Sequence, residues 1–148
     1  MIAQLFTIGY EGSDIRGFIE TLKAAHIDVL LDIRAAPISR KKGFSKNALQ
    51  AALQVAGIAY RLEHELGTPK TLRERVKLDR DYAGFFRDYG TFLAAKTPLL
   101  DELAANLEGN VALMCFERHP NTCHRLAVAA QLALLTGLTP RHLNPVAH

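Results

Sequence analysis

Hydrophobic and polar residues follow two alternating patterns along the chain. Short runs of apolar, often β-branched residues occur at 4–8, 29–33, 58–62, 111–115 and 141–143. Between most of these runs lie longer stretches in which apolar residues recur every three or four positions, as on one face of a helix. This alternation is typical of β-α-β units around a mostly parallel sheet. We predict a three-layer, Rossmann-like α/β fold with a mostly parallel central sheet of about five short strands flanked by helices. The sequence does not determine the order of the strands.

The first two predicted helices have clear boundaries. Ser13 or Asp14 can cap a helix that runs to about Ala25, because a side-chain oxygen there can accept a hydrogen bond from the first turn. Ser45 can cap a second helix, and Gly57 closes it, since glycine readily takes the positive φ that often ends a helix. The sequence thus predicts a helix after each of the first two strands.

Three more helices are predicted in the second half of the chain, over residues 81–95, 97–109 and 122–136. Gly137 stops the last of them. The segment 63–80, which precedes them, is mostly polar. We expect this segment to cross over the sheet with one or two helical turns.

Length and composition fit one α/β domain that spans residues 1–148. A chain of 148 residues with 49% hydrophobic and 22% charged residues can bury roughly two-thirds of its surface. The longest apolar stretch, Leu126 to Leu135, is too short to cross a bilayer. Nothing at the N-terminus resembles a signal peptide, and two cysteines do not make a disulfide framework. We therefore expect a cytoplasmic protein that does not bind membranes.

Charge and motifs narrow the possible partners. The net charge of +3 and the pI near 9.0 permit anionic partners without requiring them. The sequence has no GxGxxG, P-loop or G-x-S-x-G motif. Dinucleotide-binding, ATPase and α/β-hydrolase functions therefore lose their main support, and we expect no cofactor.

Polar residues gather where the predicted strands end. In an open parallel sheet, ligands bind outside the carboxyl ends of the strands, where loops and helix N-termini converge. The candidate site residues at these ends are Tyr10, Asp32, Arg34, Ser39, Arg40, Tyr60, Glu117, Thr122, Cys123, His124 and Arg125. This distribution predicts a ligand site at that edge of the sheet.

Two predicted helices begin among positive charges. His124 and Arg125 fall in the first turn of the helix predicted from Thr122, and Arg40 shortly precedes the Ser45 cap. Each cation placed at the positive end of a helix dipole costs roughly 0.3–1 kcal/mol, and a bound anion would reverse the penalty. We therefore predict an anion site, which comprises Arg34, Arg40, Arg125, Ser39 and the backbone at Thr122.

The same arginines could instead form internal ion pairs. In that interpretation Arg125 pairs with Glu117 or Asp32, and the acidic partner of Arg34 is Glu11 or Glu63. Such pairs would tie loops to the sheet and would need no ligand.

Four residues are candidates for catalysis. Glu117 and Asp32 could supply carboxylates for general acid–base chemistry. Cys123 is a candidate nucleophile, because a helix N-terminus and neighbouring cations lower the pKa of a thiol, and His124 could assist it. In the alternative, Cys123 is a small half-buried residue under the loop, and Asp32 caps backbone amides.

The remaining candidates also have two interpretations. Tyr10 and Tyr60 could stack on a base or sugar, or pack as ordinary aromatics at the edge of the site.

The sequence also offers four candidate zinc ligands of the right chemical type: Cys115, His119, Cys123 and His124. They do not form the two well-separated pairs that a structural zinc site usually has, so we expect no metal. The spacing of the phosphatase loop, a cysteine and an arginine six positions later, is also absent, because Asn121 occupies that position after Cys115.

Short segments in order along nearly the whole chain resemble the domain of unknown function 488 family. They are Thr7–Tyr10, Leu31–Arg34 with Pro37 and Ser39–Arg40, Phe44–Ser45, Gly57–Tyr60, Leu66–Gly67, Cys115-x-Glu117-x-x-Pro120-x-x-Cys-His-Arg125, and His142–Leu143. The chain departs from the family's pattern at Tyr10, where histidine is also common, and at Ile33, where valine is usual. The resemblance implies a single α/β domain whose site contains the arginines, Glu117 and the Cys-His-Arg turn, and it implies no particular reaction.

Three functions remain open from the sequence. The first is a domain that binds an anionic, phosphate-bearing or nucleotide-like small molecule, with hydrolase or transferase chemistry. The second is a nucleic-acid-binding module, whose basic strip would be Arg34, Arg40, Lys41, Lys42 and Lys46. The third is a non-catalytic structural or partner-binding domain whose arginines only brace loops.

Overall fold

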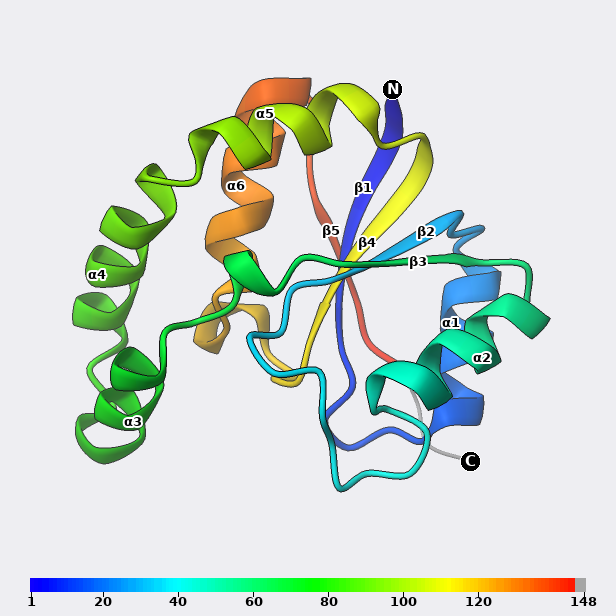
Figure 1. Cartoon of the computed structure of the whole chain (residues 1–148), viewed down its shortest axis with the longest axis horizontal. Coiled ribbons are helices and arrows are strands. Elements are labelled where there is room, and N and C mark those ends of the chain that lie inside the picture. Colours follow the sequence, from blue (N-terminus) through cyan, green and yellow to red (C-terminus); the bar gives the residue numbers. More distant parts are fainter. Residues whose placement is uncertain (146–148) are drawn as a thin grey trace.

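A computed structural model describes residues 1–145 of the chain. Its sheet contains β1 (Ile2–Gly9), β2 (Val29–Asp32), β3 (Ala59–Leu62), β4 (Gly109–Cys115) and β5 (Arg141–Leu143). The strands are all parallel and lie in the order β3-β2-β4-β1-β5 (Figure 1). The predicted three-layer α/β fold is confirmed, and the strand order that the sequence left open is settled.

Six helices and two 3₁₀ turns connect the described strands. They are α1 (Ile15–Ala24), α2 (Lys46–Val55), η1 (His64–Leu66), α3 (Lys70–Asp79), α4 (Tyr82–Ala94), α5 (Thr97–Asn106), η2 (Pro120–Thr122) and α6 (Arg125–Thr136). Helices α1 and α2 lie on one side of the sheet, and α4, α5 and α6 lie on the other (Figure 1).

The apolar runs of the central strands are continuous because both faces of the sheet are covered. In β4, Val111 and Leu113 belong to the core beneath α4–α6, whereas Ala112 and Met114 belong to the core beneath α1 and α2. Successive side chains of a strand point to opposite faces, so a strand covered on both sides needs apolar residues at every position.

The order of the strands determines which loops meet. β4 lies between β1 and β2, so the loops that leave the carboxyl ends of these three strands are neighbours. Backbone hydrogen bonds join them, since the amide of Glu11 donates to the carbonyl of Phe116 at 2.8 Å and that of Ile33 donates to Met114 at 3.2 Å. The three loops thus form one continuous edge.

Helix α6 begins three residues later than the sequence predicts. Pro120–Thr122 forms a 3₁₀ turn, Cys123 is extended with φ −127° and ψ 142°, and the helix starts at Arg125. The expected helix N-terminus at Thr122 is therefore wrong. The reason is local, because the carbonyls of His119 and Pro120 take the amides of Thr122 and Cys123 in a tighter turn.

The segment after β3 is more helical than expected. Helix α3 runs for 10 residues, and none of them is buried. It lies beside α4 at one end of the molecule (Figure 1). Its Leu72 and Val76 are partly buried against the core. Two apolar positions make a stripe too short for sequence periodicity to detect with certainty over a whole helix.

Candidate functional site

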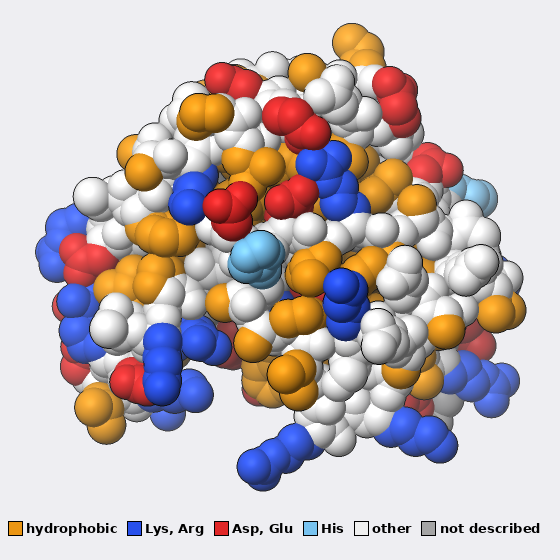
Figure 2. Space-filling model, in the orientation of Figure 1, with side chains coloured by type: hydrophobic (Ala, Val, Ile, Leu, Met, Phe, Trp, Pro, Cys, Tyr) orange, Lys and Arg blue, Asp and Glu red, His pale blue; other side chains and the backbone are white. Residues whose placement is uncertain are grey.

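A cleft of about 500 Å³ opens at the carboxyl edge of the sheet. Its walls come from the loops after β1, β2 and β4 on one side, and from α3 and the start of α4 on the other. The surface is hollowed between the α3 end of the molecule and the loop after β2, with Lys and Arg side chains on both sides (Figure 2). The cleft lies where the topology of a parallel sheet places a ligand site.

The structure brings most of the sequence-predicted residues to this cleft. Those that line it are Tyr10, Arg34, Ser39, Arg40, Glu117, Thr122, Cys123 and His124. The lining does not include Asp32, Tyr60 and Arg125. The side chains of these three residues form hydrogen bonds inside the protein.

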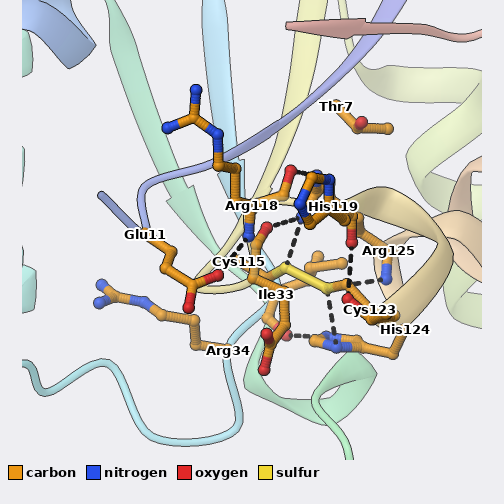
Figure 3. The surroundings of a disulfide bond; sticks show 12 residues. Thr7, Glu11, Ile33, Arg34, Cys115, Arg118, His119, Cys123, His124 and Arg125 are labelled. Atoms are coloured by element: carbon orange, nitrogen blue, oxygen red, sulfur yellow. Dashed lines mark hydrogen bonds between the residues drawn. A yellow bond between two sulfur atoms is a disulfide. The ribbon is translucent and has the colours of Figure 1, made fainter. Parts of the chain in front are cut away.

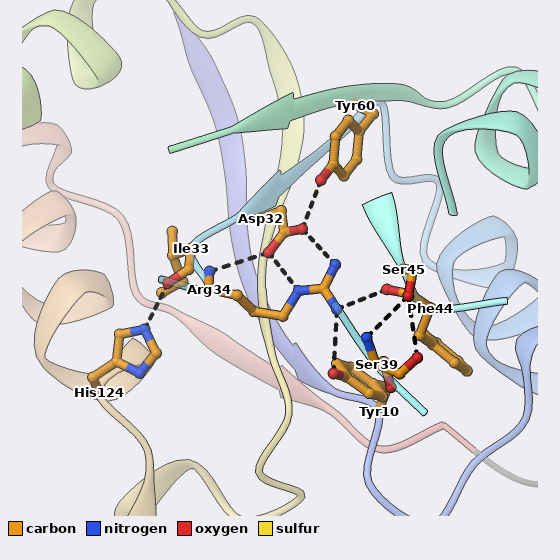
Figure 4. A network of polar contacts seen from close by, with 9 residues as sticks. All are labelled: Tyr10, Asp32, Ile33, Arg34, Ser39, Phe44, Ser45, Tyr60 and His124. Atoms are coloured by element: carbon orange, nitrogen blue, oxygen red, sulfur yellow. Dashed lines mark hydrogen bonds and ion pairs between the residues drawn. The ribbon is translucent and has the colours of Figure 1, made fainter. Parts of the chain in front are cut away.

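Asp32 and Arg34 form a buried ion pair at the end of β2 (Figure 4). The guanidinium Nη2 donates to Oδ2 at 2.7 Å, and Nε donates to Oδ1 at 2.9 Å. Tyr60 donates its hydroxyl to Oδ2 at 2.7 Å. Burial and this bond to Asp32 both raise the pKa of Tyr60 above its usual range. Asp32 is thus held by two side chains.

The other side of the Arg34 guanidinium holds the loop that follows β2. Its Nη1 donates to the carbonyl of Phe44 at 2.7 Å and to the hydroxyl of Tyr10 at 3.2 Å. Burial works against the charge of Arg34, but the hydrogen bonds and attraction from Asp32 raise its pKa above the usual value. Arg34 therefore braces three segments, and its acidic partner is Asp32, not Glu11 or Glu63.

Arg125 is buried and forms no ion pair with a carboxylate of residues 1–145. It is 0% exposed, and its Nη1 donates to the carbonyl of Glu117. Nη1 also donates to Cys115 Sγ at 3.1 Å, and Nη2 donates to the carbonyl of Arg118 at 3.0 Å. Nε has no hydrogen-bond partner within residues 1–145. Burial lowers the pKa of Arg125 to about 10, against a weaker attraction from Glu117.

Cys115 and Cys123 are joined by a disulfide at the floor of the cleft (Figure 3). The sequence did not predict this bond. The two residues are separated by 8 positions, and the 3₁₀ turn between them folds the loop back so that the sulfurs meet. Cys123 thus lies beside the start of α6 rather than in its first turn.

His124 packs against this disulfide as a neutral side chain. Its Nε2–H donates to the carbonyl of Ile33 at 2.8 Å, and Nδ1 lies 3.6 Å from Cys123 Sγ. Burial, opposed by the bond to Ile33, lowers the pKa of His124 to about 4. The side-chain atoms of Cys115, Cys123 and His124 lie within 4.8 Å of one another, which is compact enough for a metal, but each sulfur is bonded to the other.

Glu117 is the one carboxylate among the described residues that line the cleft. It is half-buried, and its pKa is raised by burial and then by the negative charge of Glu11. Arg125, Lys77 and Arg80 oppose this rise. A carboxyl group with a raised pKa can hold a proton closer to neutral pH than an exposed one.

Four exposed cations line the cleft without an acidic partner: Arg40, Arg73, Lys77 and Arg80. None of them forms an ion pair within the described part of the chain. Sequence reasoning missed the last three, which belong to α3 and the residue that ends it. Their spacing of four and then three residues puts them on one helical face and could have revealed them.

Comparison with known proteins identifies the family and adds no named relative. No curated protein and no solved structure matches the chain. No helix within residues 1–145 is both long and apolar enough to span a membrane. A family model described as "Domain of unknown function DUF488" matches residues 14–132, which include every residue that lines the cleft except Tyr10. The chain belongs to the DUF488 family.

Proposed function

We propose that the cleft binds a small anionic molecule that carries a phosphate group and is nucleotide-like in size. One observation carries this proposal: Arg40, Arg73, Lys77 and Arg80 line the cleft, and none of them forms an ion pair in residues 1–145. Among residues 1–145, these four cations and the Asp32-bound Arg34 share the cleft lining with a single carboxylate, that of Glu117.

The arrangement of these cations favours a ligand between them. Arg73, Lys77 and Arg80 belong to the α3 wall, and Arg40 belongs to the loop after β2, which forms part of the other wall. A cleft lined by one sign of charge concentrates the field and attracts the opposite charge. Arginine also matches phosphate oxygens with two parallel N–H groups. Both effects support an anion that contacts both walls.

Apolar side chains in the same cleft support a ligand with a ring. Phe116 is 45% exposed and Ile38 is 79% exposed, and both line the cleft together with Tyr82. Apolar surface with a few convergent polar groups is typical of small-molecule sites. Thr68, Ser39 and Thr122 supply such polar groups in this lining.

Glu117 is the residue that we assign to proton transfer. The carboxylate of Asp32, the other candidate, is bound by Arg34 and Tyr60 and lies outside the lining. Glu117 lies in the lining, and burial raises its pKa. These features support hydrolase or transferase chemistry on the bound phosphate compound.

A nucleic-acid interface is less well supported. The basic strip that the sequence offers for it includes Arg34, which is buried and bound to Asp32. The remaining residues of that strip, Arg40, Lys41, Lys42 and Lys46, lie along one loop and the start of α2. We therefore treat nucleic-acid binding as one outcome of the test below.

The experiment is calorimetric titration of the whole chain with ATP and with inorganic phosphate. We expect ATP to bind, and Lys77→Ala and Arg80→Ala each to weaken binding by about tenfold, because a charge-assisted hydrogen bond is worth about 1.5–3 kcal/mol. Lys70→Ala is the matched control, because Lys70 is on the same helix, pairs with Glu74 and does not line the cleft.

Two results would overturn the proposal. One is the absence of binding by both ATP and phosphate. The other is an equal loss for Lys70→Ala and Lys77→Ala, which would indicate general surface charge. Tighter binding of a single-stranded oligonucleotide than of ATP, with about 0.7 log unit lost per phosphate contact for each log unit of salt, would assign the cleft to nucleic acid instead.

A further inference from the structure

Arg125 has a positive charge in the protein interior that no acid of the described chain neutralises by contact. The side chain is 0% exposed, and its hydrogen bonds go to two carbonyl oxygens and one sulfur. Nε is buried without any partner in residues 1–145. A buried charge is costly unless it is paired, so this environment favours an additional negative charge close to Arg125.

The sulfur of Cys115 lies where that negative charge would be most effective. Arg125 Nη1 donates to Cys115 Sγ at 3.1 Å, and the Arg125 amide donates to Cys123 Sγ at 3.5 Å. In the disulfide both sulfurs are neutral. After reduction, a thiolate at Cys115 would form an ion pair with Arg125 without any large movement of either side chain.

We propose that Cys115 and Cys123 are a redox-active pair that exchanges electrons with small thiols entering the cleft, and that Arg125 stabilises the Cys115 thiolate. Both residues line the cleft, although each is only 2% exposed. A small thiol can therefore approach the sulfurs from the cleft, while the Arg125 guanidinium contacts Cys115 Sγ from the protein interior. Thiol exchange at this disulfide does not require an anion to be bound between α3 and the loop after β2.

The chemistry is a two-step exchange. The thiolate of a small thiol attacks Cys123 Sγ, the S–S bond breaks, and its electron pair leaves on Cys115 Sγ, which becomes the thiolate beside Arg125. A second thiol attacks the outer sulfur of the mixed disulfide and releases an oxidised disulfide. Two thiols lose two electrons in total and the two cysteines gain them, Cys123 takes up a proton, and the other proton goes to solvent.

Some of the other charged groups around Cys115 and Cys123 favour a thiolate, and others disfavour it. They are Glu117 and Arg118 after β4, Glu11 after β1, Asp32 and Arg34 after β2, Arg73 and Lys77 in α3, His124 before α6 and His142 in β5. The two glutamates disfavour a thiolate, and His124 stays neutral because burial lowers its pKa to about 4. Within residues 1–145, Arg125 is the one cation that donates a hydrogen bond to Cys115 Sγ. We therefore expect Arg125 to have the largest effect on the stability of a Cys115 thiolate.

A purely structural disulfide is the competing interpretation. A bond between residues 8 positions apart closes a short loop. Short loops restrict the unfolded chain less than long ones, so the stability gained here is at the low end for disulfides. Reactivity toward thiols distinguishes the two interpretations.

The first test equilibrates the folded protein with mixtures of reduced and oxidised glutathione and counts free thiols by alkylation and mass spectrometry. We expect reversible reduction in millimolar glutathione while circular dichroism remains that of the folded protein. The Cys115→Ser variant should form a mixed disulfide with glutathione at Cys123. A disulfide that resists glutathione until the protein unfolds would overturn the proposal.

The second test measures thiolate formation by ultraviolet absorbance as a function of pH. We expect Cys115, alone in the Cys123→Ser variant, to ionise at least one pH unit below the usual thiol value of about 8.5, and Cys123, alone in Cys115→Ser, to ionise at higher pH than Cys115. Adding Arg125→Gln to the Cys123→Ser variant should move the Cys115 midpoint upward. If that double variant does not fold, the comparison of the two cysteine variants still decides the question, and equal midpoints overturn the proposal.

A third measurement addresses the metal alternative. The reduced protein is incubated with Zn²⁺, passed through a desalting column and analysed for bound zinc. We expect no stoichiometric zinc after the column. One tightly held zinc per chain that blocks both thiols from alkylation would overturn the proposal, because metal-bound thiolates are not free for exchange.

Discussion

Asp32 interrupts an otherwise apolar strand, and the structure explains why a charge is tolerated there. The carboxylate is 0% exposed and lies against Arg34, whose side chain is 6% exposed. Burying either charge alone would cost several kcal/mol, so each depends on the other. Through Arg34, the pair joins the end of β2 to Phe44 in the following loop and to Tyr10 after β1.

Breaking this pair should be far more costly than breaking an exposed one. We expect Asp32→Asn to lower the free energy of unfolding by about 3–5 kcal/mol, because it leaves the Arg34 charge buried and uncompensated. Arg61→Ala is the control, since Arg61 pairs with Glu63 and Glu102 but is 32% exposed. Urea unfolding should show a loss of no more than about 1 kcal/mol for it. Similar losses for the two variants would contradict this account.

At the scale of elements, the site depends on a close approach between the end of β1 and the loop after β4. Gly9 is the last residue of β1, and a Cβ added there would overlap the carbonyl of Glu117 and meet Arg125 Nη1 at 2.8 Å. This approach places Arg125 beneath the loop, where its donors reach the carbonyls of Glu117 and Arg118. Glycine is needed here for lack of space and not for a positive φ.

Two glycine substitutions should therefore have opposite effects. We expect Gly9→Ala to destabilise the fold by roughly 1–3 kcal/mol, because backbone atoms must move to admit a methyl group. Gly90→Ala should stabilise by about 0.5–1 kcal/mol, since alanine is the better helix former. Gly90 lies within α4, and a Cβ there meets nothing within 4 Å. Thermal melting of both variants measures the difference, and a stabilised Gly9→Ala would contradict the packing described here.

The sequence predicts most elements and only part of the site. Apolar periodicity and caps locate α1 and α2, whose N-cap positions are Asp14 and Ser45 as expected, although the Ser45 hydroxyl bonds to Ser39 and not to the first turn of α2. They do not locate α3, which buries no residue fully and packs only the short apolar pair Leu72 and Val76 partly against the core. The site predicted from strand ends includes Arg40 and Glu117, but not the α3 cations, since these lie on a helix that the sequence pattern leaves undefined.

At the scale of the whole molecule, acid should destabilise the fold through His124. The imidazole is buried and neutral, and burial lowers its pKa from 6.5 to about 4. In the unfolded chain the group binds a proton near pH 6.5, so the unfolded state gains protons first as the pH falls. The stability that this group provides is complete above pH 6.5 and is lost between about pH 6.5 and pH 4.

The loss should reach about 3 kcal/mol at low pH, because each unit of pKa shift corresponds to about 1.4 kcal/mol. The measurement is urea unfolding at about pH 7.5 and about pH 4.5 for the native chain and for His124→Gln. The glutamine amide can place a donor near the position of the imidazole Nε2, which donates to the carbonyl of Ile33, and it does not titrate in this range. We expect the variant to lose less stability than the native chain between these pH values. Equal losses would show that other groups cause the acid sensitivity.

The sequence by itself determined the class of fold, because hydrophobic periodicity and capping act between residues that are close along the chain. It also placed polar side chains at the ends of the strands. Only the tertiary structure decided the partner of each charge: Arg34 has Asp32, Arg125 has carbonyls and a sulfur, and Arg73, Lys77 and Arg80 have no ion-pair partner within residues 1–145. The physical reason is that the path of each loop in space decides which of several nearby groups a side chain reaches, even where the two partners are only 2–10 residues apart in the sequence.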